Sequence, residues 1–280
     1  MTDVSAITPT QLDRQAAVNP GAGLWISSRI VAGRMVRKFI RTPQLIVFTT
    51  IQSALFLLMF RYGFGGAMRT GGSLSYVNFL VPGFITSTVL WAGMGAATGV
   101  AEDVEHGFVD RLRSLPIPRA AVLIGRSVAD AALMLWSLAI AAILGFAVGF
   151  RVTGSVSQAL AGLALCALFG FAFEWIFIVM GLVGGTAQAV QSMSLLVVPL
   201  VFLSSAYVPV ESMPGGVRQF GEIQPLTPMV NAVRGLAVGS SERAALAHST
   251  GYYVGLSLAW TAVIFVVFGL LAVARFSRRE

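Results

Sequence analysis

One carboxylate stands alone in a long apolar stretch of the chain. Glu174 lies in FGFAFEWIFIVM, and residues 152–173 and 175–210 on either side of it carry no charge. An ionisable group at membrane depth costs several kcal/mol unless it is paired or hydrated, so such residues mark functional sites. The alternative is a structural hydrogen bond between helices, with the carboxyl group protonated. Both interpretations stay open. Asp130 lies nearer the end of its own apolar tract and is interpreted as interfacial.

Other groups that could do chemistry are scarce or badly placed. There is no G-x-x-x-x-G-K-[ST] motif, and the glycine-rich run at 181–188 has no lysine, so we expect no nucleotide to bind through such a loop. His106 and His248 are predicted to lie on opposite sides of the membrane and cannot form a metal site together. Cys166 is the only cysteine, which excludes an internal disulfide. The chain is therefore predicted to be no enzyme and to hold no cofactor or metal.

The elements that must position Glu174 are membrane helices. Of the 280 residues, 56% are hydrophobic and 11% are charged, well below the charged share of soluble domains. Each of six tracts holds about 20 apolar residues, the number that a helix needs to cross the hydrocarbon core, and unpaired backbone in lipid excludes open strands. The sequence predicts an all-α integral membrane protein with spans at 44–61, 78–100, 122–149, 158–182, 188–208 and 251–274.

Basic residues predict the orientation of these spans. If both termini are cytoplasmic, twelve Lys and Arg residues lie in inner segments and six in outer ones, as the positive-inside rule requires. The net charge of +7 is thus a sign of topology and not of nucleic-acid binding. Residues 1–23 are polar and lack the apolar core of a signal peptide. They are predicted to be a disordered cytoplasmic tail before a single transmembrane domain, 24–280.

Residues 28–41 have the pattern of an amphipathic helix that ends at Thr42-Pro43. Its apolar positions share one side and its basic positions the other. Such a helix lies in the membrane interface, with the basic side toward anionic headgroups. We expect membrane lipids, not nucleic acid, as its partner. The basic residues are Arg34, Arg37, Lys38 and Arg41.

Segment 101–119 has the pattern of a short amphipathic helix between two spans. Gly107 precedes its apolar stripe, and Pro116 stops it. The stripe either rests on the bilayer or inserts into a groove on a cytoplasmic protein. Acidic residues before the glycine favour insertion into a protein groove, because anionic lipid would repel them. The acidic residues are Glu102, Asp103 and Glu105, and the stripe is Phe108, Leu112 and Leu115.

A polar stretch, AYVPVESMPGGVRQFGEIQPLTP at 206–228, separates two apolar tracts. Pro214 and Pro225 divide residues 209–239 into two helical pieces, each too short to span. Backbone that enters the membrane without crossing is tolerated only where protein buries it or water reaches it. The pieces are therefore either two re-entrant half-helices at the outer face or a surface loop packed on the bundle.

Three stretches of the chain carry motifs of a known family. They are NFLVPGFI at 78–85, a segment within 102–130 that is similar to an E-x-x-x-G-x-x-x-x-L-x-x-x-P pattern, and the F-L-S, P-x-x-x-x-P, Pro-Leu-Thr and R-x-L series within 202–239. In these stretches the chain resembles the permease subunits of type-2 ABC exporters, in the daunorubicin-resistance-like branch of multidrug and lipid export. Two positions depart from the family pattern: Phe108 replaces a frequent Thr, and Gln224 replaces Asn.

The resemblance implies a permease of the bacterial cytoplasmic membrane without its own energy source. ATP and Mg²⁺ would bind to a separate ATPase subunit, present in two copies, and a second permease would complete a homodimer or heterodimer. The helix at 28–41 would be a connecting helix near the ATPase. The residues implied to form the coupling helix, in a cleft of the ATPase, are Glu102, Glu105, Gly107, Phe108, Arg111 and Leu112.

The resemblance also places a path for an amphipathic drug or lipid between the two permeases, lined by spans one, two and five, since its apolar lining suits such cargo. The outer half-helices would cap this path as a gate. Two other functions stay open: a non-transporting scaffold or sensor that recruits a cytoplasmic partner, and a secondary carrier centred on Glu174. The path candidates are Phe56, Phe84, Glu174, Met193 and Phe202, and the gate candidates are Pro209, Pro214, Pro225 and Leu226.

Overall fold

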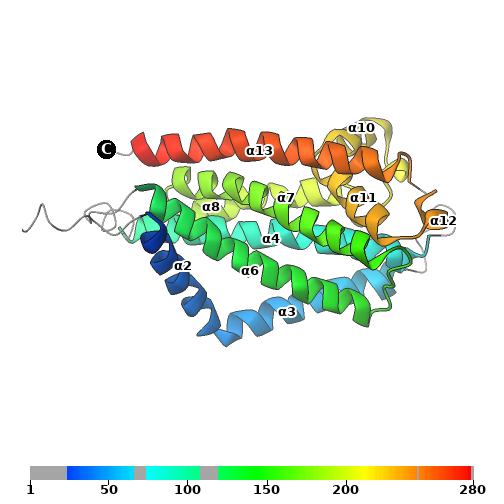
Figure 1. Ribbon diagram of the computed structural model, residues 1–280, viewed down its shortest axis with the longest axis horizontal. Coiled ribbons are helices and arrows are strands. Elements are labelled where there is room, and N and C mark those ends of the chain that lie inside the picture. The colour runs from blue at the N-terminus through cyan, green and yellow to red at the C-terminus, as the bar shows by residue number, and fades with distance from the viewer. Residues whose placement is uncertain (1–23, 66–73, 108–118, 245, 279–280) are drawn as a thin grey trace, which may run out of the picture.

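The computed structural model describes residues 24–65, 74–107, 119–244 and 246–278, and every regular element in these ranges is a helix (Figure 1). The long elements are α2 (Leu24–Ile40), α3 (Pro43–Leu58) with its π-helical continuation η1 (Met59–Phe64), α4 (Tyr76–Glu105), α6 (Arg119–Ala147), α7 (Val156–Val183) and α13 (Thr250–Arg278). The short elements are α8 (Ala187–Ser194), α9 (Val197–Phe202), η2 (Val210–Ser212), α10 (Gly215–Ile223), α11 (Leu226–Ala237) and α12 (Ser240–Arg243).

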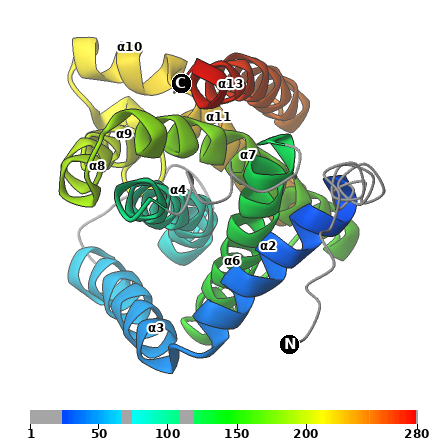
Figure 2. The same ribbon diagram turned by 90° about the vertical axis from the view of Figure 1, so that its left-hand side faces the viewer.

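Helix α4 is the axis of the bundle. It packs against α6, α7, α8 and α11 (Figure 2), and every residue from 76 to 90 is buried. A helix enclosed on all sides must be apolar all round, which explains why this stretch lacks an amphipathic pattern. The helix begins at Ser75, whose side-chain oxygen accepts a hydrogen bond from the Asn78 N–H at 3.2 Å, a standard N-cap.

Five helices in the described ranges are long and apolar enough to cross a membrane. They confirm five of the predicted spans within a few residues, and the chain is therefore a multi-pass membrane protein. Their ranges are Ile46–Phe64, Tyr76–Glu105, Ile124–Ala147, Val156–Val183 and Thr250–Arg275.

The predicted span at 188–208 is not confirmed, because no single long helix covers it. The chain forms two short helices there, α8 and α9, joined by tight turns in which the Leu196 N–H donates to Met193 O and the Val198 N–H to Leu195 O. Such i to i−3 bonds tighten a helix, and Pro199 just beyond has no N–H to restore the regular pattern. The predicted six continuous spans are thus not reproduced.

The α8–α9 pair nevertheless runs the length of α4. At one end, the Ala187 N–H donates to a carboxylate oxygen of Glu105, in the last turn of α4, at 3.1 Å. At the other end, the carbonyls of Ser205 and Phe79, near the start of α4, both bind Arg234. The segment after α7 therefore returns along the whole bundle although no single helix carries it.

The two ends of the bundle are distinct. Helix α2, the end of α4 and the end of α13 lie at one end, and α10, α11 and α12 lie at the other (Figure 1). This arrangement agrees with termini on one side of the membrane, while the cytoplasmic assignment of that side remains a prediction. Helix α2 begins four residues before the predicted 28–41 and packs along α6, with Ser28 and Ala32 buried.

The outer segment forms two short helices, as its prolines predict. Pro214 is the N-cap residue of α10, and Pro225 is that of α11. Helix α11 packs against α4, α7 and α13, and most of its residues are buried. Helix α10 instead leaves an apolar face exposed, formed by Val217, Phe220 and Ile223. The re-entrant position of these helices remains a prediction.

The Pro82-Gly83 pair of α4 marks where the segment after α9 meets the axis. Pro82 cannot donate a backbone hydrogen bond, and the hydroxyls of Thr86 and Ser87 bond to the carbonyls of Pro82 and Gly83, each at 2.8 Å. A Cβ atom on Gly83 would collide with the backbone of Ala206. The glycine is therefore required because two backbones touch here.

Arg234 joins three segments at the outer end, and its side chain is only 1% exposed. Its guanidinium donates to Phe79 O at 2.9 and 3.1 Å, to Ser205 O at 2.7 Å and to Asn231 Oδ1 at 2.5 Å. Its Cζ also lies 3.8 Å from the centre of the Phe79 ring, a cation–π contact. Among the described residues no carboxylate forms an ion pair with Arg234, so carbonyl oxygens and this ring stabilise a charge that arginine cannot lose.

Two glycines of α4 give a matched test of the backbone contact. We expect Gly83→Ala to lower the thermal stability of the protein in detergent, because Ala206 would have to move. Gly95 has nothing near its missing Cβ atom, so Gly95→Ala should leave stability unchanged or raise it by up to about 1 kcal/mol through helix propensity. Equal effects of the two substitutions would contradict the assigned contact.

Two arginines near the outer end test the buried network. Arg234→Ala removes the guanidinium that donates to the buried carbonyls of Phe79 and Ser205 and should destabilise the protein by roughly 3 kcal/mol, at about 1–3 kcal/mol for each buried polar group that loses a partner. Arg218 is exposed and pairs with Glu222 at 2.7 Å, so Arg218→Ala should leave stability unchanged. Thermal unfolding in detergent, followed by size-exclusion chromatography, measures both. Comparable melting temperatures for the two variants would refute the role of Arg234.

Candidate functional site

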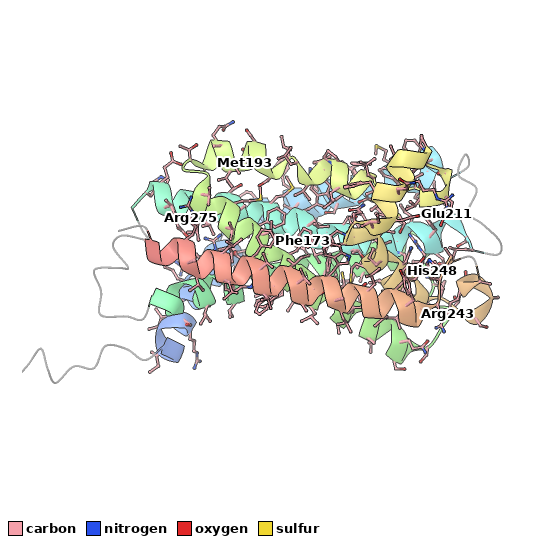
Figure 3. All side chains as sticks on the ribbon, turned by 90° about the horizontal axis from the view of Figure 1, so that it is seen from above. Phe173, Met193, Glu211, Arg243, His248 and Arg275 are labelled. Atoms are coloured by element: carbon pink, nitrogen blue, oxygen red, sulfur yellow. The ribbon has the colours of Figure 1, made fainter. Side chains whose placement is uncertain are left out.

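A small cavity lies where α4, α6 and α7 meet. Its volume of about 10 Å³ is at the lower limit for one water molecule. Phe173, which precedes Glu174, lies midway between the end marked by Arg275 and the end marked by Glu211 (Figure 3). The cavity is thus at mid-depth in the bundle. Its lining is Val89, Ala92, Gly93, Ala96, Asp130, Met134, Gly170 and Glu174.

Glu174 extends from α7 into this cavity wall and is 3% exposed. Neither of its carboxylate oxygens has a hydrogen-bond partner among the described residues. The structural alternative, a hydrogen bond between helices, is therefore not seen in this part of the chain. Unsatisfied buried polar groups are rare in proteins and call for a functional or solvent explanation.

Arg126 of α6 holds two other carboxylates beside the cavity. Its Nη1 lies 2.7 Å from Asp103 Oδ2, on α4, and its Nε lies 2.5 Å from Asp130 Oδ2, one turn further along α6. Its Nη2 donates to Ala96 O at 3.2 Å. Asp130 is 8% exposed, so a buried ion pair, and not solvent, accommodates its charge, and its interfacial depth in the membrane remains a prediction.

The geometry limits the chemistry of the cavity. Three carboxylates, Asp103, Asp130 and Glu174, accompany one guanidinium, and the remaining lining residues are apolar or small. In the described ranges, no group of three His, Cys, Asp or Glu residues could hold a metal ion. The arrangement suits binding of water and exchange of a proton more than it suits nucleophilic or metal chemistry.

The path candidates do not form one site. Phe56 and Phe202 come together, with ring centres 6.5 Å apart. Phe84 is buried in the core, whereas Met193 is 37% exposed and lies toward the Arg275 end of the bundle (Figure 3). Glu174 lines the separate cavity. Only the pair Phe56 and Phe202 therefore remains as a local cluster.

This cluster is larger than the sequence suggested. Phe60 stacks on Tyr207 at 4.6 Å and on Phe64 at 5.2 Å, and Tyr207 lies 5.4 Å from Phe56. Phe202 and Phe64 remain partly exposed. The rings come from α3, η1, α9 and the turn after it. Phe60 and Tyr207 are buried, so the exposed part of the cluster is formed mainly by Phe64 and Phe202. We call Phe56, Phe60, Phe64, Phe202 and Tyr207 the aromatic cluster.

The coupling candidates divide at Gly107. Glu102 and Glu105 are exposed in the last turns of α4 and do not form a helix with the residues that follow. Gly107 has φ +65°, the left-handed conformation that ends a helix, which corrects the expectation of one coupling helix across all six residues. Phe108, Arg111 and Leu112 lie outside the described residues.

The remaining candidates are placed as follows. Arg34, Arg37 and Arg41 of the connecting helix are exposed, and the side chain of Lys38 lies outside the description. Of the gate candidates, Pro214 is exposed, Pro209 and Pro225 are partly buried and Leu226 is fully buried. The roles of both groups remain predictions.

Two functional arginines were not selected from the sequence. Arg126 precedes Asp130 by four positions, and Asn231 precedes Arg234 by three, so each pair shares one helix face. That spacing was the available signal. The spacing was overlooked because the hydropathy pattern assigned Arg126 to the edge of a span and Arg234 to a loop.

Comparison with known proteins places this architecture in a family. The family described as ABC-2 type transporter matches residues 28–238. The chain is 29% identical over 249 residues to the daunorubicin resistance ABC transporter permease protein DrrB1 of Streptomyces coeruleorubidus, covering 88% of this chain and 84% of that protein. It is also 29% identical over 203 residues to the probable doxorubicin resistance ABC transporter permease protein DrrC of Mycobacterium tuberculosis, covering 70% of this chain and 71% of the relative. The chain therefore belongs to the ABC-2 type transporter family, as a membrane permease and not an enzyme.

Proposed function

We propose that this permease exports amphipathic drugs across the bacterial cytoplasmic membrane, driven by a separate ATPase subunit that binds ATP and Mg²⁺. The observation that supports this most is the end of α4. Its exposed acidic turn, Glu102 to Glu105, lies at the end of the bundle opposite α10 and α11 (Figure 1). A motor bound there would act on the axis helix from the side opposite the outer helices.

Contacts of that turn provide a route for motion into the bundle. Asp103 is ion-paired with Arg126 of α6 at 2.7 Å, and Glu105 accepts a hydrogen bond from the first turn of α8 at 3.1 Å. A carboxylate at a helix N-terminus is favoured by the helix dipole. Displacement of the α4 end by the ATPase would therefore move α6 and α8 together, tilt the spans and switch access to the cargo path.

The cargo path is proposed to include the aromatic cluster. Two of its rings, Phe56 and Phe202, lie on α3 and α9, and exposed apolar side chains lie on α3 and just before α9, such as Phe48, Ile51 and Leu196. Exposed apolar surfaces of this kind require lipid or a second subunit. A second permease, identical or related, would enclose the cluster, and planar aromatic cargo would stack on its rings.

Two alternatives receive less support. A scaffold that only recruits a cytoplasmic partner does not need the axis helix to be linked by specific bonds to two others. A carrier centred on Glu174 does not need a docking segment, and family membership favours an ATP-driven machine. Export of a lipid in place of a drug has no separate support, whereas the relatives' names refer to drug resistance.

A charge reversal tests docking of the ATPase. Glu102→Lys should reduce co-purification of the permease with an ATPase subunit encoded beside it, because the acidic docking surface becomes basic. Glu222→Lys is the matched control, since Glu222 is also an exposed helical glutamate but lies on α10 at the other end. Affinity purification from detergent, normalised to permease yield, measures both. Equal recovery of the ATPase with the two variants would exclude docking at the α4 end.

Doxorubicin efflux tests the aromatic cluster. Phe202→Ala should reduce ATP-dependent efflux by about twofold to tenfold, because an aromatic contact contributes roughly 0.5–1.5 kcal/mol beyond its buried area. Phe146 on α6 is similarly exposed and lies outside the cluster, so Phe146→Ala should leave efflux unchanged. Fluorescence of the drug in cells with matched permease levels measures export. Unchanged efflux in Phe202→Ala would remove the cluster from the path.

A further inference from the structure

An ionised Glu174 would have no hydrogen-bond or ion-pair partner among the residues that the structure describes. Arg126 is the nearby cation, but three of its five N–H bonds are directed at Asp103, Asp130 and Ala96 O, and none is directed at Glu174. The other helices packed on α7 add little. Helix α13 has no titratable residue between Tyr253 and Arg275, α8 has none, and Arg234 of α11 is bound at the outer end.

Burial and like charge together favour a bound proton. An isolated carboxylate in an apolar environment is so costly that the group takes up a proton instead. A second carboxylate in the same site adds to this, since two neighbouring carboxylates do not readily ionise together. Asp130 is that second group, because it lines the same cavity. The pair therefore needs one positive charge that Arg126 does not supply.

The cavity determines which positive charge fits. Hard metal ions such as Ca²⁺ take about six to eight oxygen ligands, whereas this lining offers two carboxyl groups among Val89, Met134 and small residues. About 10 Å³ admits roughly one water molecule, which needs two to four polar partners. The oxygens of Glu174 and Asp130 are such partners. A proton with one bridging water would supply hydrogen-bond donors to the unpartnered oxygens of Glu174.

We propose that Glu174 and Asp130 form a proton-binding site inside the membrane, with one proton held between them through a water molecule. We further infer that Arg126 links this site to the end of α4. If Asp103 moves away with that end, the guanidinium becomes free to compensate Glu174, and the proton is released to water through Asp130. By reciprocity, protonation favours the arrangement in which Asp103 holds Arg126. This inference goes beyond export and does not depend on it.

Infrared spectroscopy of the purified permease, without any ATPase, tests the site directly. At neutral pH the wild-type protein should show the carbonyl-stretch band of a protonated carboxylic acid, and the band should be absent in Glu174→Gln. Labelling of glutamate carboxyl groups with ¹³C should shift the same band in the unmutated protein, so the test holds even if the variant folds poorly. Absence of a label-sensitive band at neutral pH would overturn the proposal.

The link to α4 has its own matched pair. Asp103→Asn frees part of Arg126 to compensate the site, so the band should titrate about 1 pH unit lower, a tenfold loss of proton affinity, as expected for one nearby charge. Glu102→Gln also removes one negative charge next to Asp103 but from an exposed side chain, and the midpoint should stay in place. Equal midpoints in Asp103→Asn and wild type would refute the link. The infrared measurement uses the permease alone. A negative result would therefore not affect the export proposal, and a lack of export would not affect the proposed proton-binding site.

Discussion

The outer half of the bundle depends on one buried guanidinium that has no carboxylate partner in the described chain. Such a charge is tolerated only where oxygen atoms surround it, and for Arg234 they come from Phe79, Ser205 and Asn231. Phe79 belongs to the 78–85 motif, and Ser205 and Asn231 belong to the 202–239 series. Motifs far apart in the chain therefore pack together as one unit. The close approach of the α4 backbone to the segment after α9 requires a glycine at position 83, and the aromatic cluster includes Tyr207 of that same segment.

The inner half uses the opposite solution. Arg126 is held by two carboxylates and one carbonyl, and a third carboxylate lies near it without a partner. A guanidinium bound by carbonyls has nothing to exchange, because carbonyls do not titrate. A guanidinium that lies near three carboxylates and pairs with two of them can exchange one partner for another. The two networks thus differ in chemistry: carbonyl oxygens bind the guanidinium of Arg234 at one end of the bundle, and titratable carboxylates bind that of Arg126.

Much of the fold was predictable because it depends on composition along the chain. The lengths of the apolar tracts predicted five spans, Gly107 predicted the break after α4, and Pro214 and Pro225 predicted the starts of α10 and α11. The α8–α9 break was not predicted, since hydropathy does not register the effect of Pro199 on a backbone pattern. The site was less predictable: Glu174 was found by its isolation, whereas its relation to Asp130 and Arg126 depends on how three helices pack.

The break between α8 and α9 also bears on how the chain enters the membrane. A helix that reaches across the bilayer satisfies its own backbone and can be inserted by itself. The segment around Leu195–Val198 instead joins two short helices through i to i−3 bonds, and each helix is shorter than a membrane is thick. We therefore expect this part of the chain to enter the membrane together with α4, which is synthesised before it and against which α8 packs.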